Sequence, residues 1–388
     1  MRAATHHNPE LCPAGIFSMA GVVEASEDAA SPLSQTGHRT VSSSRPPADD
    51  HDPRWPPPFM LYLGNAPDDL AAKTARGLVQ FRPQWCVGQF RDAGCKTSVH
   101  VPDMTFAQAR AAGARTMIVG VANAGGRLGP EAVAHVVAAL DAGLNVASGL
   151  HERLSSHPQI VEAARRNGRH LFDARTPPDT PVGNGLPRAG RRLLTVGTDC
   201  STGKMYTTLS LETELRARGR TADFRATGQT GIFIAGRGIP IDAVVADFIS
   251  GGIEWLSPAR HDGGWDLIEG QGSLFHASFA GVSMGLLHGA QPDALVLCHE
   301  PGRPHMRGLK HFPVPGLRET LDANLAAARL TNPGVVAVGV ALNTSKLAPD
   351  AAARLCRETE DALGLPAQDP VRDGVGRIVD RLLACVPD

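Results

Sequence analysis

The chain has 388 residues, of which 42% are hydrophobic, and it carries 38 Lys and Arg against 39 Asp and Glu. This length and apolar content allow a substantial core and suggest two domains with additional chain. The balanced charge gives no sign of a nucleic-acid partner or of binding to an acidic membrane surface. The expected partners are therefore small molecules.

The cysteines and the apolar stretches indicate the compartment. The seven cysteines are scattered without CxxC spacing, which predicts neither a disulfide framework nor a zinc site. No run approaches the roughly 18 apolar residues of a membrane span. Residues 14–23 follow Glu10 and are interrupted by glycine, which disfavours a secretory signal. The sequence thus predicts a soluble, cytoplasmic protein without a membrane partner.

The chain divides into three predicted segments. Residues 1–56 are rich in Ala, Ser, Pro, His and Asp and lack periodicity, which predicts a disordered N-terminal extension. Residues 57–185 alternate short apolar runs with amphipathic stretches, and a Pro- and Gly-rich linker at 175–191 leads into a second region of this kind, 186–388. The alternation predicts an α/β fold with two parallel, doubly wound sheets.

The expected elements follow in chain order. The first domain is predicted to contain strands at 59–64, 116–121, 145–148 and 170–172 and helices at 71–79, 130–142 and 160–167. The second is predicted to contain strands at 193–196, 243–248, 267–269, 294–298 and 335–342 and helices at 206–218, 317–327 and 350–363. Ligands of such sheets bind outside the carboxyl ends of the strands.

A phosphate-binding loop follows the first strand of the second domain. The run Gly197-Thr198-Asp199-Cys200-Ser201-Thr202-Gly203-Lys204-Met205 has glycine at both ends of a turn, then a lysine and a helix whose free N–H groups face one point. Met205 stands where such loops carry Ser or Thr, and a thioether cannot replace the hydroxyl that ligates Mg²⁺. The loop predicts a phosphate-bearing ligand rather than an ordinary metal-assisted ATPase.

A second motif supports this interpretation. The loop itself is a variant, with five residues between Gly197 and Gly203, so a glycine turn with a structural lysine is the alternative. Downstream, the run 265–272 is a short strand that ends in Glu269 and continues into glycines. This pattern is typical of the acidic partner of a phosphate-binding loop.

These motifs carry a resemblance to known proteins. The second domain resembles the dethiobiotin-synthetase-like branch of the P-loop proteins in its strand-GTD-x3-GK loop and its Glu269-Gly270-Gln271-Gly272 strand end. From Phe59 onward the chain is similar to the D-glutamate N-acetyltransferase family. The strings that carry this similarity include Gly149-Leu150-His151-Glu152-Arg153-Leu154, Thr198-Asp199-Cys200-Ser201-Thr202-Gly203-Lys204-Met205-Tyr206-Thr207, Ala226-Thr227-Gly228-Gln229-Thr230-Gly231 and Asp247-Phe248-Ile249-Ser250-Gly251.

The resemblance implies a Rossmann-like first domain, a P-loop NTPase-like second domain, and transfer of an acetyl group from acetyl-CoA to the amine of D-glutamate in D-amino-acid catabolism. Met205 fits the family pattern. With acetyl-CoA as co-substrate and no metal, the expected residues for its phosphates and adenine are Gly197, Ser201, Thr202, Gly203, Lys204, Met205 and Asn343. Cys200 invites a covalent acyl intermediate if the helix N-terminus lowers the pKa of its thiol, with a packing role as the alternative.

Direct transfer needs a base for the attacking amine and donors for the oxyanion at the thioester carbon. Asp247 and Glu269 are candidate bases at predicted strand ends, and either is alternatively a structural cap. Asp199, in the loop, is a third candidate that alternatively orients Lys204. The Gly228 to Gly231 turn, with Gln229 and Thr230, is expected to contact the substrate.

An acidic acceptor needs cationic partners, preferably Arg. Arg237 and the basic cluster around Arg303 are the candidates, with a solvated basic loop as the alternative. The rival function is an ATP-dependent kinase or ligase of the dethiobiotin-synthetase type, in which Asp199 and Glu269 hold Mg²⁺ through water. A third is a nucleotide-sensing regulator without catalysis. Paired α/β domains of this kind favour a homo-oligomer.

Overall fold

The computed structural model describes residue 52 and residues 54–121 and 125–387. Most of the predicted N-terminal extension lies outside these residues. Within its last part, Trp55 is fully buried, and its ring stacks on Phe172 with centroids 5.0 Å apart and meets Phe233 edge-on at 5.2 Å. No described helix is long and apolar enough to cross a membrane.

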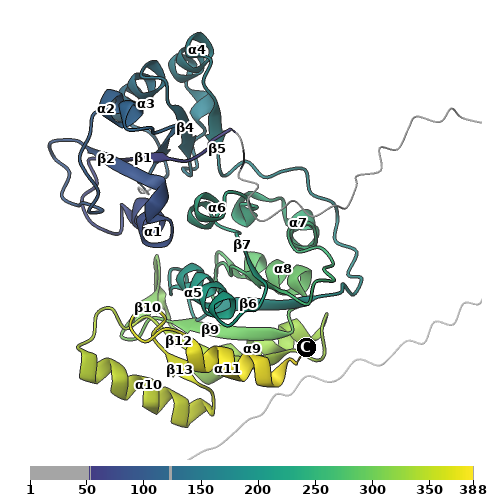
Figure 1. The fold of residues 1–388 in the computed structure, drawn as a ribbon. Coiled ribbons are helices and arrows are strands. Elements are labelled where there is room, and N and C mark those ends of the chain that lie inside the picture. Colours follow the sequence, from purple (N-terminus) through teal and green to yellow (C-terminus); the bar gives the residue numbers. More distant parts are fainter. Residues whose placement is uncertain (1–51, 53, 122–124, 388) are drawn as a thin grey trace, which may run out of the picture. The chain divides into compact units, whose positions relative to one another are not determined.

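The first domain is built on a five-stranded parallel sheet in the order β2-β1-β3-β4-β5 (Figure 1). Its strands are β1 (Phe59–Gly64), β2 (Cys86–Arg91), β3 (Thr116–Val119), β4 (Asn145–Ser148) and β5 (Leu171–Asp173). Its helices are α1 (Lys73–Phe81), α2 (Phe106–Ala111), α3 (Pro130–Asp141) and α4 (Pro158–Asn167), with 3-10 turns η1 (Pro83–Trp85) and η2 (Leu154–Ser156). Every residue of β1 is buried, as expected for a parallel strand covered on both faces.

The second domain is built on a six-stranded sheet in the order β13-β12-β9-β6-β8-β7, all parallel (Figure 1). Its strands are β6 (Arg191–Gly197), β7 (Ala222–Arg225), β8 (Trp265–Ile268), β9 (Ala294–His299), β12 (Val336–Leu342) and β13 (Ala367–Gln368), and β10 (His305–Met306) with β11 (Leu309–Pro313) forms a separate antiparallel hairpin. Its helices are α5 (Lys204–Ala217), α6 (Gln229–Ala235), α7 (Ile249–Leu256), α8 (Ala280–Ala290), α9 (Leu317–Arg329), α10 (Pro349–Leu363) and α11 (Gly376–Cys385).

The predicted strand at 243–248 is wrong. The structure has two 3-10 turns in this region, η3 (Ile241–Ala243) and η4 (Ala246–Phe248). Ile241 and Val244 are buried while the two residues between them are exposed. A spacing of three places both side chains on one side of a 3-10 turn, whereas a strand would bury alternate residues.

The edge strand β7 was missed because charged residues interrupt its apolar pattern. Asp223 and Arg225 are both buried. Nη2 of Arg225 lies 2.8 Å from Oδ1 of Asp266 on the neighbouring strand β8, and Arg260 pairs with the same oxygen at 2.6 Å. A buried charge is tolerated when it is paired in this way, so a strand with two charged residues forms part of the sheet.

Candidate functional site

Loops from four strands of the second domain meet at the carboxyl edge of its sheet. Strand β6 runs into the phosphate-binding loop and lies between β8 and β9, with β7 beyond β8. Hydrogen bonds join the loop after β6 to those after β8 and β9, and join the loop after β8 to that after β7. The predicted motifs therefore come together at the edge where parallel sheets bind ligands.

The backbone of the phosphate-binding loop is shaped for close approach. Ser201 and Gly203 have positive φ angles of 55° and 99°. A Cβ on Gly197 would lie 2.8 Å from Oγ1 of Thr202 and 3.0 Å from Nζ of Lys204, so only glycine fits there. Helix α5 begins after Gly203 without a side-chain cap. Its first N–H groups are thus available to an anion.

Lys204 lies beneath this loop and is buried. Its Nζ donates to the carbonyl oxygens of Asp199 at 2.8 Å and of Gly272 at 2.9 Å, which ties the loop after β6 to the loop after β8. Burial lowers the pKa of the Lys204 ammonium. The lysine therefore places positive charge at the base of the cradle and also holds its two sides together.

The hydrogen-bond partners of the Asp199 carboxylate do not include Lys204, the group that it was alternatively expected to orient. The carboxylate is fully buried, and its Oδ2 pairs with Nη1 of Arg303 at 2.5 Å and accepts from the backbone N–H of Arg307 at 2.8 Å. Arg303 also pairs with Glu300 and donates to the carbonyl of Cys200 at 2.7 Å. In this arrangement Asp199 and Arg303 brace the loop from the β9 side.

The Cys200 thiol is not activated as the sequence pattern suggested. Desolvation raises its pKa, and the nearby Asp199 adds to this effect, although Lys204, Arg307 and Arg303 oppose it. The helix begins four residues further along, at Lys204. A thiol with a raised pKa is a poor nucleophile, which favours the packing role for Cys200.

Glu269 directly follows β8 and carries a buried carboxylate. Its Oε2 accepts from the backbone N–H groups of Thr227 at 3.0 Å and Gly228 at 3.1 Å, immediately before α6 begins. Burial raises the pKa of Glu269 to about 7 despite these hydrogen bonds and the nearby Lys204. A carboxylate that titrates near neutral pH suits proton transfer, and the same group caps a helix.

Met205 and the α6 residues lie against helix α1 of the first domain. A Cβ on Gly77 of α1 would lie 2.9 Å from Cγ2 of Thr230 and 3.5 Å from Cε of Met205. Oγ1 of Thr74 is 3.1 Å from Oγ1 of Thr230. The Met205 side chain therefore packs in the contact between the two domains, and it comes from the sequence position at which other P-loops carry the metal-ligating hydroxyl.

Gln229 is also held by the first domain. Nε of Arg175 donates to Oε1 of Gln229 and to the carbonyl of Gly149, both at 2.8 Å, and the same guanidinium pairs with Asp242. Sequence reasoning did not single out Arg175, because its partners lie far away along the chain.

Three predicted residues lie apart from this constellation. Asp247 is exposed within η4 and does not end a strand. Arg237 follows the carboxyl end of α6, whereas Gln229 begins it. Asn343 follows β12, which β9 separates from β6, and its Oδ1 accepts from the N–H of Ser345 at 3.3 Å.

A cluster that contains potential metal ligands borders the loop. Ligand atoms of Asp199, Cys200 and His276 lie within 4.8 Å of one another. The carboxylate of Asp199 already pairs with Arg303, and the ring nitrogens of His276 lie 3.0 Å from the carbonyl oxygen of Arg307 and 3.2 Å from the N–H of Ser278. A cation there would have to displace these partners.

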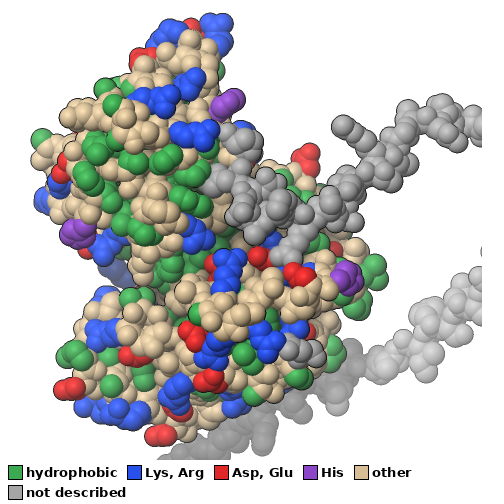
Figure 2. All heavy atoms as spheres, viewed as in Figure 1, with side chains coloured by type: hydrophobic (Ala, Val, Ile, Leu, Met, Phe, Trp, Pro, Cys, Tyr) green, Lys and Arg blue, Asp and Glu red, His purple; other side chains and the backbone are tan. Residues whose placement is uncertain are grey.

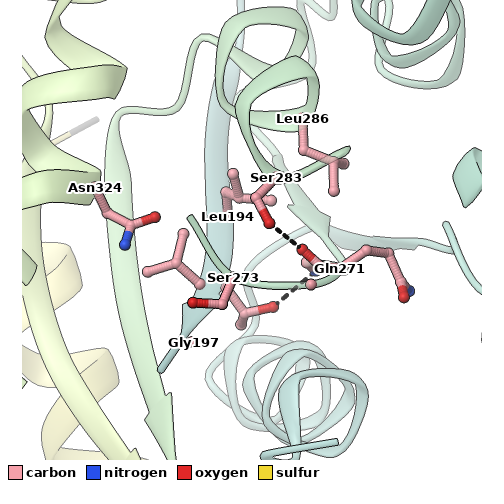
Figure 3. A pocket seen from close by; sticks show the side chains of 11 residues that line it. Leu194, Gly197, Gln271, Ser273, Ser283, Leu286 and Asn324 are labelled. Atoms are coloured by element: carbon pink, nitrogen blue, oxygen red, sulfur yellow. Dashed lines mark hydrogen bonds between the residues drawn. The ribbon is translucent and has the colours of Figure 1, made fainter. Parts of the chain in front are cut away.

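A narrow cavity lies between β6, the loop after β8, and helices α8 and α9 (Figure 3). It is lined by residues that include Gly197, Gln271 and Asn324, and Oγ of Ser283 donates to the carbonyl of Gln271 at 2.8 Å. Its free space of about 10 Å³ holds about one water molecule. A substrate must therefore approach the loop from elsewhere.

Comparisons with known proteins agree with this architecture. Residues 181–379 match a family described as a domain of unknown function, DUF1611_C, P-loop domain, and residues 90–177 match DUF1611_N, a Rossmann-like domain. A crystal structure of a DUF1611 family protein from Anabaena variabilis is similar with a TM-score of 0.76 and 30% identity, covering 85% of this chain and 100% of that chain. The predicted fold of both domains is confirmed.

Two curated relatives carry the same name, D-glutamate N-acetyltransferase. The protein from Tritonibacter scottomollicae is 50% identical over 328 residues, which cover 84% of this chain and 98% of the relative. The protein from Pseudoalteromonas sp is 46% identical over 327 residues, with the same two coverages. The resemblance drawn from the loop motifs is confirmed, and the chain belongs to the DUF1611 family, together with these D-glutamate N-acetyltransferases.

Proposed function

We propose that this protein transfers an acetyl group from acetyl-CoA to the amine of D-glutamate or a related acidic amino acid. The observation that carries the proposal is a phosphate-binding loop whose free helix N-terminus is intact while its metal-ligating hydroxyl is replaced by Met205, which packs on the first domain. Such a loop suits a ligand that keeps its phosphates. The names of both curated relatives support the same reaction.

In this reaction the neutral amine attacks the thioester carbon, a C–N bond forms, and the C–S bond breaks to release free CoA. Lys204 and the N–H groups at the start of α5 bind phosphates of the donor. Glu269, whose pKa is raised to about 7, accepts the proton that the amine loses. Our candidates for stabilising the oxyanion are backbone N–H groups of the turn at 228–231 or of the turn at 270–272.

No metal is needed for this chemistry. We place the reaction in the cytoplasm, which suits the scattered free cysteines of the described chain. A homo-oligomer remains our expectation for the assembly.

The test is to mix the purified protein with acetyl-CoA and D-glutamate in the presence of EDTA. Free thiol is followed with a colorimetric reagent, and N-acetylglutamate is identified by mass. Thiol release that depends on D-glutamate and survives EDTA is the expected result. No transfer, together with turnover of Mg-ATP, would instead support the kinase or ligase function.

A further inference from the structure

Arg307 projects a guanidinium to the outer side of the phosphate-binding loop. The residue lies in the turn between β10 and β11. Its backbone N–H donates to Asp199 at 2.8 Å, and its Nη1 donates to Oγ of Ser201 at 2.6 Å. Both ends of the residue are thus fixed to the loop, while the side chain as a whole is exposed.

Lys73 belongs to the first-domain helix that contacts Met205 at the end of the same loop. It is the first residue of α1 and lies four residues before Gly77, the point of contact with Met205 and Thr230. Residues four apart share one face of a helix, and the adjacent Thr74 contacts Thr230 directly. Helix α1 therefore lies against Thr230 of α6 and Met205 of α5, and Lys73 is exposed at the start of α1.

Unlike Arg303 and Arg175, these two exposed cations have no acidic partner among the described residues. Arg303 pairs with Asp199 and Glu300, and Arg175 pairs with Asp242. Among residues 52, 54–121 and 125–387, neither Lys73 nor Arg307 forms an ion pair. Partial desolvation lowers the pKa of Lys73, and the positive charges of Arg307 and then Arg175 lower it further.

Like charges held near each other without a counter-charge repel, and an anion between them would remove the repulsion. We propose that Lys73 and Arg307 together bind an oxyanion of one substrate, either the side-chain carboxylate of the acidic acceptor or a phosphate of the acyl donor. This inference rests on the proposed acetyl transfer. It gives the first domain a direct part in substrate binding, in addition to covering the loop.

The test compares Lys73→Met, Arg307→Met and the double variant with Lys96→Met, which removes an exposed lysine elsewhere in the first domain. KM is measured separately for D-glutamate and acetyl-CoA. Loss of one charge-assisted contact should raise one KM about 10- to 100-fold, while Lys96→Met leaves both unchanged. A rise for D-glutamate identifies the carboxylate, and a rise for acetyl-CoA identifies the phosphate. Both KM values within twofold of wild type would overturn the proposal.

A binding measurement separates this inference from the proposed reaction. If the wild type shows no transfer, calorimetry with D-glutamate, CoA and inorganic pyrophosphate still reports on the site. The oxyanion site is supported if both single variants bind at least one of these three ligands about tenfold or more weakly than the wild type. Their melting temperatures should be unchanged. Equal affinities for all three probes in wild type and variants contradict it.

Discussion

In each domain a glycine turn follows a parallel strand. The two turns differ in whether neighbouring residues of the protein occupy the turn or leave it open to a ligand. In the first domain, the turn at Gly125 and Gly126 is closed by its neighbours, because a Cβ on Gly126 would lie 2.7 Å from Cδ2 of His151 and Oε2 of Glu152 accepts from the N–H of Leu128 at 2.7 Å. In the second domain, the loop around Gly203 leads into α5, which begins without a side-chain cap. Helix α3 after the first-domain turn also lacks such a cap, but it begins at Pro130, which has no backbone N–H. A glycine turn becomes a binding cradle only where its N–H groups are left to a ligand.

Buried charged side chains also distinguish the second-domain loop. Buried ionic groups gather around the second-domain loop, where Asp199, Lys204 and Glu269 are all buried. On the face of the molecule drawn in Figure 2, which includes both domains, basic and acidic side chains lie at the surface. In the reaction that we propose, the second domain therefore carries the chemical groups, and the first contributes α1 and Arg175 as contacts to it.

The largest expected effect is a loss of stability when a side chain is added at Gly270, in the loop after β8. In Gly270→Ala, the new Cβ would overlap the carbonyl oxygen of Thr195. Since that neighbour is backbone within the sheet, we expect a loss of at least about 3 kcal/mol of stability. Gly281→Ala is the matched control, because nothing lies within 4 Å of its Cβ. Thermal unfolding of both variants measures the difference, and a wild-type melting temperature for Gly270→Ala would refute the packing described for this edge.

Lys204→Met, in the second-domain loop, tests whether this loop, and not the first-domain turn, binds acetyl-CoA. The variant loses the charge under the cradle and two hydrogen bonds to carbonyls. We expect KM for acetyl-CoA to rise about 10- to 100-fold, which corresponds to about 1.5–3 kcal/mol for a charged contact. Glu152→Gln, which weakens the closure of the first-domain turn, should leave this KM unchanged. An equal rise of KM for acetyl-CoA in both variants would contradict the conclusion that only the second-domain loop binds the donor.

Glu269→Gln tests the buried carboxylate by its pH dependence. The folded pKa of about 7 lies above the ordinary value of 4.5, so the unfolded chain loses this proton first. The resulting penalty to stability grows as pH rises from about 4.5 to 7 and is constant above that. The melting temperature of the variant minus that of the wild type should therefore be larger at pH 8 than at pH 5.

The same variant reports on catalysis. If Glu269 is the base, kcat/KM of the wild type rises with pH through about 7, and this step disappears in Glu269→Gln together with most of the activity. The amide oxygen can still accept from Thr227 and Gly228, so the cap is retained. An active variant that keeps the step would reduce Glu269 to a structural cap.

Met205→Ser has the smallest expected effect. The serine restores a hydroxyl after Lys204 but removes the thioether that packs beside Gly77. We expect a loss of stability of about 1–2 kcal/mol, a change in acetyl transfer below about threefold, and no gain of Mg²⁺-dependent ATP turnover. ATP hydrolysis that appears with Mg²⁺ would show that this one side chain decides between the two chemistries.

Sequence reasoning found the parts of the site whose signals are local. The loop from Gly197 to Lys204 and the strand end at Glu269 are contiguous motifs, and the alternation of apolar runs predicted both sheets. It missed Arg175, the hydrogen bond between Asp199 and Arg303, and the proposed pair of Lys73 and Arg307, because these pairs join residues roughly 50 to 230 positions apart. Asp247 was expected at the end of a strand, but it lies within the 3-10 turn η4.

The most direct test of the central claim is hydrogen exchange with CoA and EDTA present. Amides of the peptide covering residues 198–207 should exchange more slowly when CoA binds, and those of residues 125–128 should not change. That result would place the donor at the uncapped loop of the second domain without metal. Slowing confined to the first-domain turn, or no slowing at residues 198–207 with saturating CoA, would contradict the account.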